Sequence, residues 1–428
     1  MEFPVSYDIT RIGSRVFSST PNGVHRVDEA LARYFLTRSE APTTAAWFPR
    51  PIPHRLITRE AALEVLAGVD AHFDENENTN LEPLYRSIRD WVLAAGADTP
   101  KTSPRIHHSR EKRLGVAITW MLRHGIGAAA SRAMPRDARY LNVSLYGLGV
   151  AGAFDWLAHR PDVKAVFFIH DMLPFETPEY FVPAELARHH VRMRNLARHG
   201  AGVVVSTHIV KAALRAHLTK LGRSDMPILV APPPVAPIFH DKVEADDELA
   251  ARPFFIQVGT IEPRKNHLMV LHVWRELVER HGAAAPKLVL VGARGWENEN
   301  IIDLLDRASS LHSHVLEVSG LPTPVLRRLL SSARALLMPS FAEGYGLPLV
   351  EALAAGTPAI ASDLPVFREV AEDSFVALGR IDAEGWLRAI EAFSGLRPFL
   401  EYASARTSPI FASRDTFFAD VSAFSQSL

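Results

Sequence analysis

Residues 341–363 read FAEGYGLPLVEALAAGTPAIASD, which joins a glycine-rich turn to a short helical pattern and then to an apolar strand. The run ALLMPS, just before this stretch, is also apolar and of strand length. Pro348 stands at the helix start, where proline is favoured, and Gly356 follows the last turn. The order strand, loop, helix, strand predicts a parallel α/β sheet with the glycine-rich turn at the carboxyl end of a strand.

Two glutamates flank the glycine-rich turn, Glu343 in the loop and Glu351 in the first helical turn. Ligands of open parallel sheets bind at this edge, where helix N-termini present free N–H groups to phosphates. Gly344 and Gly346 allow the backbone to approach such a ligand closely. Because carboxylates accept hydrogen bonds from vicinal hydroxyls, one sugar at each end of a diphosphate accounts for both glutamates. The alternative is that Glu351 only complements the helix dipole and Glu343 is solvated.

A second charged pair follows another apolar strand pattern. The segment VGTIEPRKNH, residues 258–267, places Arg264 and Lys265 just before a helical pattern. In a parallel sheet this loop lies at the same edge as Glu343, and the planar fork of arginine and the compact charge of lysine both suit phosphates. The segment therefore predicts a pyrophosphate site, with a solvated surface pair as the alternative.

The second half of the chain alternates between apolar strand patterns and helical patterns. The strand patterns are FFIQVG, KLVLVG, VLEVSG, ALLMPS and TPAIAS. Strands that are apolar on both faces and separated by helices indicate a parallel sheet covered on both sides. Residues from roughly 245 to 400 are therefore expected to form a Rossmann-like domain.

The first half repeats the alternation less regularly, with strand patterns VSYDI, TTAAWF, RYLNVSL, VKAVFFIH, GVVVST and PILVA. Residues 73–138 show no regular pattern and read as an irregular insertion. The proline-rich segment APPPVAPIF, residues 231–239, separates the two alternations and is expected to act as a hinge. The expected fold class is α/β, with two doubly wound Rossmann-like domains, 1–235 and 236–404, that face a central cleft.

Composition restricts the class of protein. Of the 428 residues, 47% are hydrophobic, 22% are charged and none is cysteine, which is typical of a globular enzyme without disulfides or thiolate metal sites. We expect a cytoplasmic protein without a spanning helix, because we find no signal-peptide pattern and no apolar run of about 18 residues. Residues 1–240 carry 29 basic and 23 acidic side chains, whereas residues 241–428 carry 18 and 25. The basic half suggests an anionic partner, either membrane lipid or a lipid-linked phosphate, and a solvated surface is the alternative.

The motifs VGTIEPRKN, LVLVG and FAEGYGLPLVEALAAGTPAIASDLPVFREV together resemble glycosyltransferase family 4, whose members have the GT-B fold. This resemblance covers residues 254–380. A thinner resemblance, to bacterial exopolysaccharide mannosyltransferases, rests on DITR, TPNGVHRVD, YLNV and FFIHDMLP in the first half. By resemblance to the fold, the helical pattern within 405–428 should cross back and pack on the first domain.

The resemblance implies roles for named residues. Glu343 would contact the transferred sugar, Glu351 the ribose, and Arg264 with Lys265 the diphosphate. His170, the last residue of VKAVFFIH, would face the sugar near its anomeric carbon. The implied catalytic residues are His170, Arg264, Lys265 and Glu343. The implied donor-binding residues are Asn22, Gly23, Gly259, Thr260, Arg264, Lys265, Gly344, Tyr345, Gly346, Leu347 and Glu351.

Two departures from the family pattern concern the phosphate and acceptor sides. Many relatives carry arginine where this chain has Thr260, so Arg264 is expected to supply that charge. The segment YLNVSLYGL lacks the glycine-histidine pattern common among relatives.

The implied reaction is retaining transfer of a hexose from a nucleotide sugar, without a metal or a further cofactor. We expect mannose from GDP-mannose, transferred to a lipid-linked oligosaccharide or polysaccharide acceptor in cell-surface polysaccharide synthesis. A UDP-sugar such as UDP-glucose is the alternative donor, and nucleic acid is not an expected partner. Helix pattern PAELARHHVRMRNLARHG is either an ordinary amphipathic helix or a face that docks peripherally on anionic lipid.

Two other classes of protein fit part of the sequence. Gly147, Gly149 and Gly152 form a G-x-G-x-x-G after a strand pattern, and Asp171 follows at the spacing of a dinucleotide site. This pattern favours an NAD-dependent oxidoreductase, although no Tyr-x-x-x-Lys pair accompanies it. A non-catalytic nucleotide-sugar-binding subunit has the same motifs as the enzyme and differs only in activity.

Overall fold

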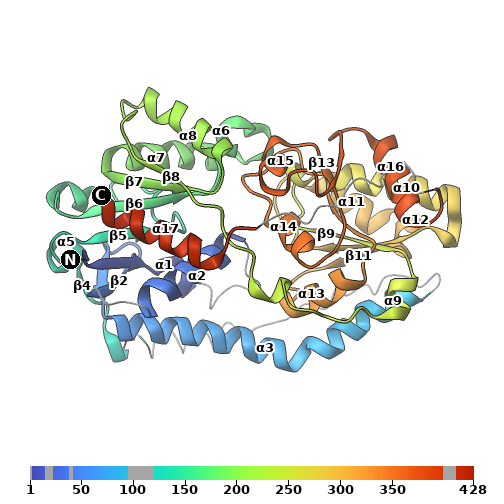
Figure 1. Cartoon of the computed structure of the whole chain (residues 1–428), viewed down its shortest axis with the longest axis horizontal. Helices are drawn as coiled ribbons and strands as arrows, with labels where there is room; N and C mark the ends of the chain where they lie inside the picture. The colour runs from blue at the N-terminus through green and yellow to red at the C-terminus, as the bar shows by residue number, and fades with distance from the viewer. Residues whose placement is uncertain (1, 15–22, 38–41, 95–119, 121, 399–410) are drawn as a thin grey trace. The chain divides into compact units, whose positions relative to one another are not determined.

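The computed structural model describes residues 2–14, 23–37, 42–94, 120, 122–398 and 411–428, with side chains throughout except at residues 70–81. The chain divides into two units (Figure 1). The first unit comprises Met1–Glu75, His107–Pro234 and Ala412–Leu428, and the second comprises Asn76–Ile106 and Val235–Phe411.

The described strands of the first unit form one sheet in the order β4-β3-β2-β1-β5-β6-β7-β8. The β2–β3 and β3–β4 pairs are antiparallel, and all other pairs are parallel. The strands are β1 (Val5–Asp8), β2 (Thr43–Trp47), β3 (Arg55–Ile57), β4 (Ala128–Ala129), β5 (Arg139–Asn142), β6 (Lys164–Ile169), β7 (Gly200–Val205) and β8 (Ile228–Val230). The helices include α1 (Thr10–Ser14), α2 (Gly23–Thr37), α5 (Ala130–Ala133), α6 (Leu173–Glu176), α7 (Pro183–His199), α8 (His208–Lys220) and α17 (Arg414–Ser427).

The second unit is built on a six-stranded, fully parallel sheet in the order β11-β10-β9-β12-β13-β14. Its strands are β9 (Phe254–Val258), β10 (Lys287–Val291), β11 (Val315–Val318), β12 (Ala335–Met338), β13 (Ala359–Ser362) and β14 (Val376–Leu378). Its helices are α9 (Asp247–Ala251), α10 (His267–His281), α11 (Glu299–Arg307), α12 (Ser309–His312), α13 (Thr323–Ser332), α14 (Leu347–Ala354), α15 (Pro365–Ala371) and α16 (Ala383–Phe393).

Both sheets have the strand order of a dinucleotide-type Rossmann fold, which reverses between β1 and β5 in the first unit and between β9 and β12 in the second. The expected fold class, two doubly wound Rossmann-like domains, is therefore confirmed. Trp274 and Trp386 are fully buried in the core of the second unit, where Trp274 packs edge-on against Phe255. Ligand chemistry is expected at the reversal point, beyond the carboxyl ends of β9 and β12.

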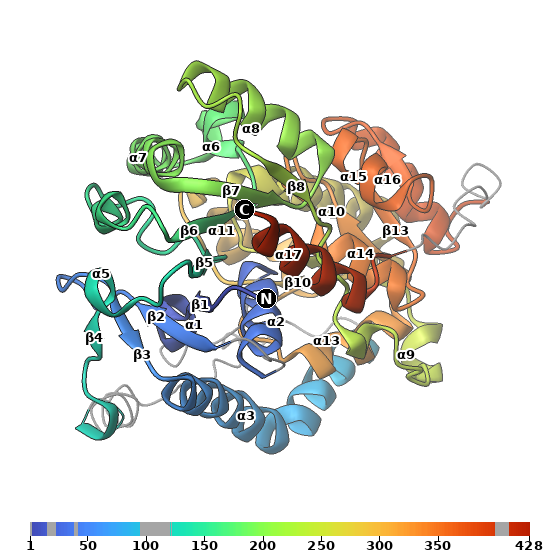
Figure 2. The ribbon, with the colours of Figure 1, turned by 60° about the vertical axis from the view of Figure 1, so that its left-hand side comes forward.

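The C-terminal helix α17 belongs to the first unit and lies beside α2 (Figure 2). Phe418 stacks on Tyr34 of α2 at 4.8 Å between ring centroids. The backbone N–H of Phe3 donates a hydrogen bond of 2.8 Å to Gln426, which joins the two ends of the chain. Phe417, Phe418 and Val421 are buried, so this helix is part of the first unit's core.

Helix α3 (Arg59–Leu93) occupies part of the region 73–138, for which the sequence predicts no regular element. The polar run before Pro83 contains no apolar helical period. Pro83 itself argues against a helix, because proline in a helix interior lacks the N–H of the regular hydrogen-bond ladder. After Pro83 the buried residues Leu84, Ile88, Trp91 and Val92 recur at helical spacing. That stripe is the signal by which the helix could have been predicted.

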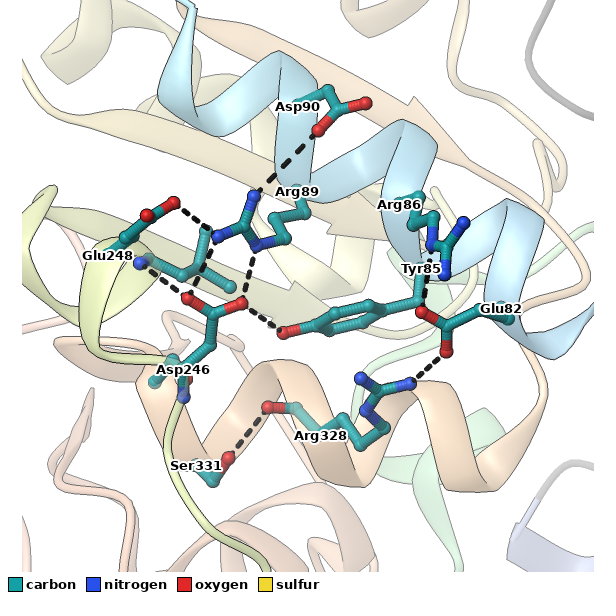
Figure 3. A network of polar contacts seen from close by, with 11 residues as sticks. Glu82, Tyr85, Arg86, Arg89, Asp90, Asp246, Glu248, Arg328 and Ser331 are labelled. Carbon is teal, nitrogen blue, oxygen red and sulfur yellow. Dashed lines mark hydrogen bonds and ion pairs between the residues drawn. The ribbon is translucent and has the colours of Figure 1, made fainter.

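The end of α3 packs within the second unit through a charged cluster (Figure 3). Asp246 accepts hydrogen bonds from the Tyr85 hydroxyl at 3.1 Å and from Arg89 Nε at 2.5 Å, and its other oxygen caps α9 through the N–H of Leu249 at 3.0 Å. The guanidinium of Arg328 lies 3.7 Å from the centre of the Tyr85 ring.

Lys287, at the start of β10, fixes the last turn of α3. Its buried ammonium donates to the carbonyl oxygens of Trp91 at 3.0 Å and Ala94 at 2.9 Å. A cation at a helix C-terminus satisfies carbonyls that have no partner within the helix and complements the dipole. Burial lowers the pKa of Lys287 to about 8.

Candidate functional site

The loop after β9 is shaped by residues with special backbone angles. Gly259 has φ +148°, which favours glycine, and Asn266 has φ +56°. The Asn266 amide donates to the carbonyl oxygens of Pro339 at 3.1 Å and Arg380 at 2.8 Å. These bonds tie the loop of Arg264 and Lys265 to the segment after β12, so both loops share one edge of the sheet.

A close backbone contact supports the same loop from the side of β10. A Cβ built on Gly292 would lie 1.9 Å from the carbonyl oxygen of Gly259, so only glycine fits there. The N–H of Gly295 and the amide of Asn298 both donate to the carbonyl oxygen of Ile261, at 3.0 and 2.8 Å. The loops after β9 and β10 are therefore joined by backbone contacts.

Glu343 lies at the centre of a compact ion cluster. Its Oε1 accepts from Lys265 Nζ at 2.5 Å and from the Ser340 hydroxyl at 2.7 Å, and its Oε2 accepts from Arg264 Nη1 at 2.8 Å. Arg264 Nη2 donates to Glu262, and Arg264 Nη1 also donates to the carbonyl oxygen of Ala342 at 2.8 Å. The sequence-predicted residues Arg264, Lys265 and Glu343 are thus brought together.

Burial and charge act in opposite directions in this cluster. Burial alone would raise the pKa of Glu343, but the nearby charges of Lys265 and Arg264 hold it at about 2. Burial lowers the pKa of Lys265 against the opposing charge of Glu343, and burial raises the pKa of Glu262. Glu343 is therefore an anion at neutral pH and its carboxylate is an acceptor only.

Helix α14 begins one residue earlier than Pro348, after Gly346, which has φ +100°. Glu351 consequently lies in the second turn, and its expected place in the first turn was wrong. A Cβ on Gly346 would lie 2.6 Å from the Phe367 ring, so glycine is required for space as well as for backbone angle. Glu351 is buried, with 4% of its surface exposed.

The remaining donor-site predictions fall along the same loops or in the first unit. Thr260 follows Gly259, and Tyr345 and Leu347 flank Gly346 at the start of α14. Burial raises the pKa of the Tyr345 hydroxyl above its ordinary range. Gly23 is the first residue of α2, and Asn22 lies outside the described residues.

His170 follows β6 at the carboxyl edge of the first unit's sheet. Its Nε2 lies 2.8 Å from the carbonyl oxygen of Val143, and its ring stacks on Phe168 with centroids 4.6 Å apart. Because a carbonyl only accepts, Nε2 carries the proton and Nδ1 is left as the acceptor. Burial, against the effect of the Val143 hydrogen bond, lowers the pKa of His170 to about 4, so the ring is neutral at pH 7.

The lowered pKa of His170 predicts an acid sensitivity. The unfolded chain takes up this proton near pH 6.5 and the folded chain near pH 4, so the folded state binds fewer protons between these values. As the pH is lowered through this window, the free energy of unfolding should decrease, by up to about 1.4 kcal/mol per pH unit from this group. Urea unfolding of wild type and His170→Gln at pH 7, 6, 5 and 4.5 checks this. The variant should lose less stability, and parallel curves would contradict the assignment.

The G-x-G-x-x-G segment does not have the geometry of a dinucleotide fingerprint. That fingerprint opens a long helix, whereas Gly152 is followed by the short 3-10 helix Asp155–His159. A Cβ on Gly147 would lie 2.9 Å from the Phe48 ring, and one on Gly149 would lie 2.4 Å from Arg188. These two glycines serve close side-chain packing.

Sequence reasoning did not select Glu262 or Ser340, which complete the ion cluster. Glu262 has only 1% of its surface exposed and pairs with Arg264. The motif EPRK places it two residues before Arg264, and this short spacing between a carboxylate and two cations was the available signal. Ser340 carries no comparable signal, because serine at a strand end is common in any fold.

The described residues contain neither a metal-ligand cluster nor a membrane-spanning helix. No group of three or more histidine, aspartate or glutamate side chains there is arranged to hold a metal ion. Within the same part of the chain, none of the helices combines the length and the apolar character needed to cross a membrane.

Residues 241–401 match the family described as Glycosyl transferases group 1. Serotype-specific mannosyltransferase WbdA of Escherichia coli is 29% identical over 227 residues, which are 49% of this chain and 27% of that protein. The chain thus spans far less than the full length of WbdA. O-antigen chain mannosyltransferase B of Escherichia coli is 29% identical over 305 residues, which are 68% of this chain and 78% of that protein.

Among solved structures, Anabaena Alr3699/HepE in complex with UDP-glucose superposes with a TM-score of 0.62 over 99% of this chain and 100% of that one, at 13% identity. At this identity the similarity shows the fold. Together with the two Rossmann-like sheets, these similarities show that residues 241–401 form a domain of the group 1 glycosyltransferases, and that the chain has the GT-B fold and is homologous to bacterial O-antigen mannosyltransferases.

Proposed function

We propose that the protein is a retaining, metal-independent mannosyltransferase that uses GDP-mannose as donor. The acceptor is a lipid-linked oligosaccharide or polysaccharide at the cytoplasmic face of the membrane. One observation supports this most strongly: Arg264, Lys265 and Glu343 converge at the carboxyl edge of β9 and β12, beside the N-terminus of α14. The mannose preference is supported by the relatives, two of which are named as mannosyltransferases.

In this proposal the cluster acts on the leaving diphosphate. As the bond between the anomeric carbon and the β-phosphate breaks, negative charge grows on the phosphate oxygens. Arg264, Lys265 and the N–H groups at the start of α14 stabilise that charge, and they are held in place before the reaction starts. Glu351 accepts hydrogen bonds from the ribose hydroxyls, and Glu343 from the hydroxyls of the transferred sugar.

His170 contributes to the proposed reaction as a neutral ring. With Nε2–H fixed on Val143, its Nδ1 accepts a hydrogen bond from a hydroxyl of the transferred sugar. The pKa of about 4 keeps the ring uncharged throughout the neutral range, so His170 does not repel the positive charge that develops at the anomeric carbon.

Thermal unfolding with added ligands tests the donor. GDP, UDP, GDP-mannose, UDP-glucose and NAD would each be added at roughly a hundred times a plausible Kd. A ligand of the folded state then adds about 2.7 kcal/mol to the free energy of unfolding and raises Tm by several degrees. We expect shifts with GDP and GDP-mannose. Shifts with UDP and UDP-glucose instead would replace mannose by another hexose, and a shift with NAD alone would contradict the proposed function.

A further inference from the structure

The ion cluster around Glu343 is already neutral before any ligand binds. Two carboxylates, Glu262 and Glu343, pair with two cations, Arg264 and Lys265. All four side chains are largely buried, with exposed fractions of 2% for Glu262, 9% for Glu343, 14% for Arg264 and 12% for Lys265. A diphosphate that approaches these cations therefore meets a site whose charge is already compensated.

The geometry shows which group provides this compensation. The carboxylate of Glu343 is bidentate: Oε1 faces Lys265 Nζ and Oε2 faces Arg264 Nη1. Two oxygens of one anion on these two cations form the same arrangement that a phosphate would make. Ser340 holds Oε1 in this position with a hydrogen bond of 2.7 Å. Glu262 differs, because it contacts only the Nη2 side of Arg264.

We infer that Glu343 is an internal competitor of the donor diphosphate, an inference that rests on the proposed function. In the donor-free protein its carboxylate occupies Lys265 and Arg264. An arriving diphosphate takes over these cations, and the released carboxylate turns to the hydroxyls of the transferred sugar. With a nucleotide sugar, hydrogen bonds from the sugar hydroxyls replace the contacts that Glu343 loses. A nucleoside diphosphate without a sugar displaces Glu343 from the cations and supplies no hydroxyl to replace them.

This exchange has a consequence for the order of events. After transfer, the sugar hydroxyls leave with the acceptor, and Glu343 is again without a partner in the donor site. It then returns to Lys265 and Arg264 and weakens the hold on the product diphosphate. The same side chain thus makes the site prefer the intact donor over the product diphosphate and favours release of the product.

Titration calorimetry with GDP, or with UDP if only UDP stabilises the wild type, tests the inference on Glu343→Gln. Glutamine keeps the shape and still accepts from Ser340 and Lys265, but it carries no charge. We expect the variant to bind the nucleoside diphosphate at least about tenfold more tightly than wild type, although its transfer activity falls. If Glu343 instead made a favourable contact with the diphosphate, the variant would bind the nucleoside diphosphate more weakly than wild type.

Two controls separate competition from a general change in charge. Glu276→Gln removes one negative charge from the exposed face of α10, where Glu276 pairs with Arg280, and the affinity of this variant should equal that of wild type. Ser340→Ala changes no charge but loosens Glu343, so it should bind the diphosphate more tightly than wild type and less tightly than Glu343→Gln. Equal tightening in Glu276→Gln and Glu343→Gln would overturn the inference.

The outcomes also separate this inference from the proposed function. Unchanged or weaker diphosphate binding by Glu343→Gln, with clear binding by wild type, would overturn only the competition. If neither wild type nor Glu343→Gln binds GDP or UDP, the proposed function fails and the competition fails with it.

Discussion

Lys265→Ala is expected to lower the rate of sugar transfer by at least about a hundredfold while leaving the fold intact. Removal of one preorganised group that stabilises developing charge typically costs about 3 kcal/mol in the transition state. Lys265 Nζ lies 2.5 Å from Glu343 Oε1. The lysine side chain packs against Gly259, where a Cβ built on the glycine would lie 3.2 Å from Lys265 Cε. The measurement is kcat/KM for release of nucleoside diphosphate in the presence of acceptor.

The control for Lys265→Ala is Lys242→Ala, which removes an exposed lysine of the same unit and should retain wild-type turnover. Circular dichroism and Tm of both variants show whether the fold is intact. If Lys265→Ala keeps more than about a tenth of wild-type turnover, the phosphate site has been assigned to the wrong loop.

Gly292→Ala is expected to destabilise the second unit and to disturb the loop at Gly259. A methyl group there would lie 1.9 Å from the carbonyl oxygen of Gly259, far inside contact distance. Backbone cannot rotate away as a side chain can, so we expect a loss at the upper end of the overpacking range, about 2 to 3 kcal/mol. Tm should fall by roughly 5 to 10 °C. Transfer should fall as well, because the loop that carries Lys265 must shift.

Gly68→Ala is the control for this substitution. Gly68 lies in α3, and no atom lies within 4 Å of a Cβ built there. Alanine in a helix interior should stabilise the protein by about 0.5 to 1 kcal/mol. A Gly292→Ala protein with wild-type Tm would show that the two backbones do not approach as closely as described.

The second unit was predictable because its strands are apolar on both faces. β12 coincides with an uninterrupted apolar run, and β9 and β10 are apolar except at Gln257 and Lys287; such runs are the clearest signal of a buried parallel strand. The glycine-rich loops were predictable as well, because short turns between a strand and a helix limit where the chain can pass. The edge at which Arg264, Lys265 and Glu343 meet follows from parallel topology alone.

The pairing inside the site was not predictable from the sequence. That Glu343 contacts both cations depends on side-chain directions, which spacing along the chain does not determine. The start of α14 was misplaced because proline tolerates either of the first helical positions, and the conformation of Gly346 decides between them. Helix α3 was missed because Pro83 interrupts the pattern before the stripe of Leu84 and Ile88 becomes visible.

The cluster that holds the end of α3 has a consequence for synthesis of the chain. Arg89 contacts Asp246, which follows it by 157 residues, and Lys287 contacts the carbonyl of Trp91 across 196 residues. At ribosomal speeds of roughly 5 to 20 residues per second, the end of α3 leaves the exit tunnel at least about eight seconds before these partners leave it. The newly made helix end is therefore uncovered during this interval, and a fragment that begins at residue 235 would expose the side chains of Asp246, Lys287 and Arg328 that contact the helix end in the complete chain.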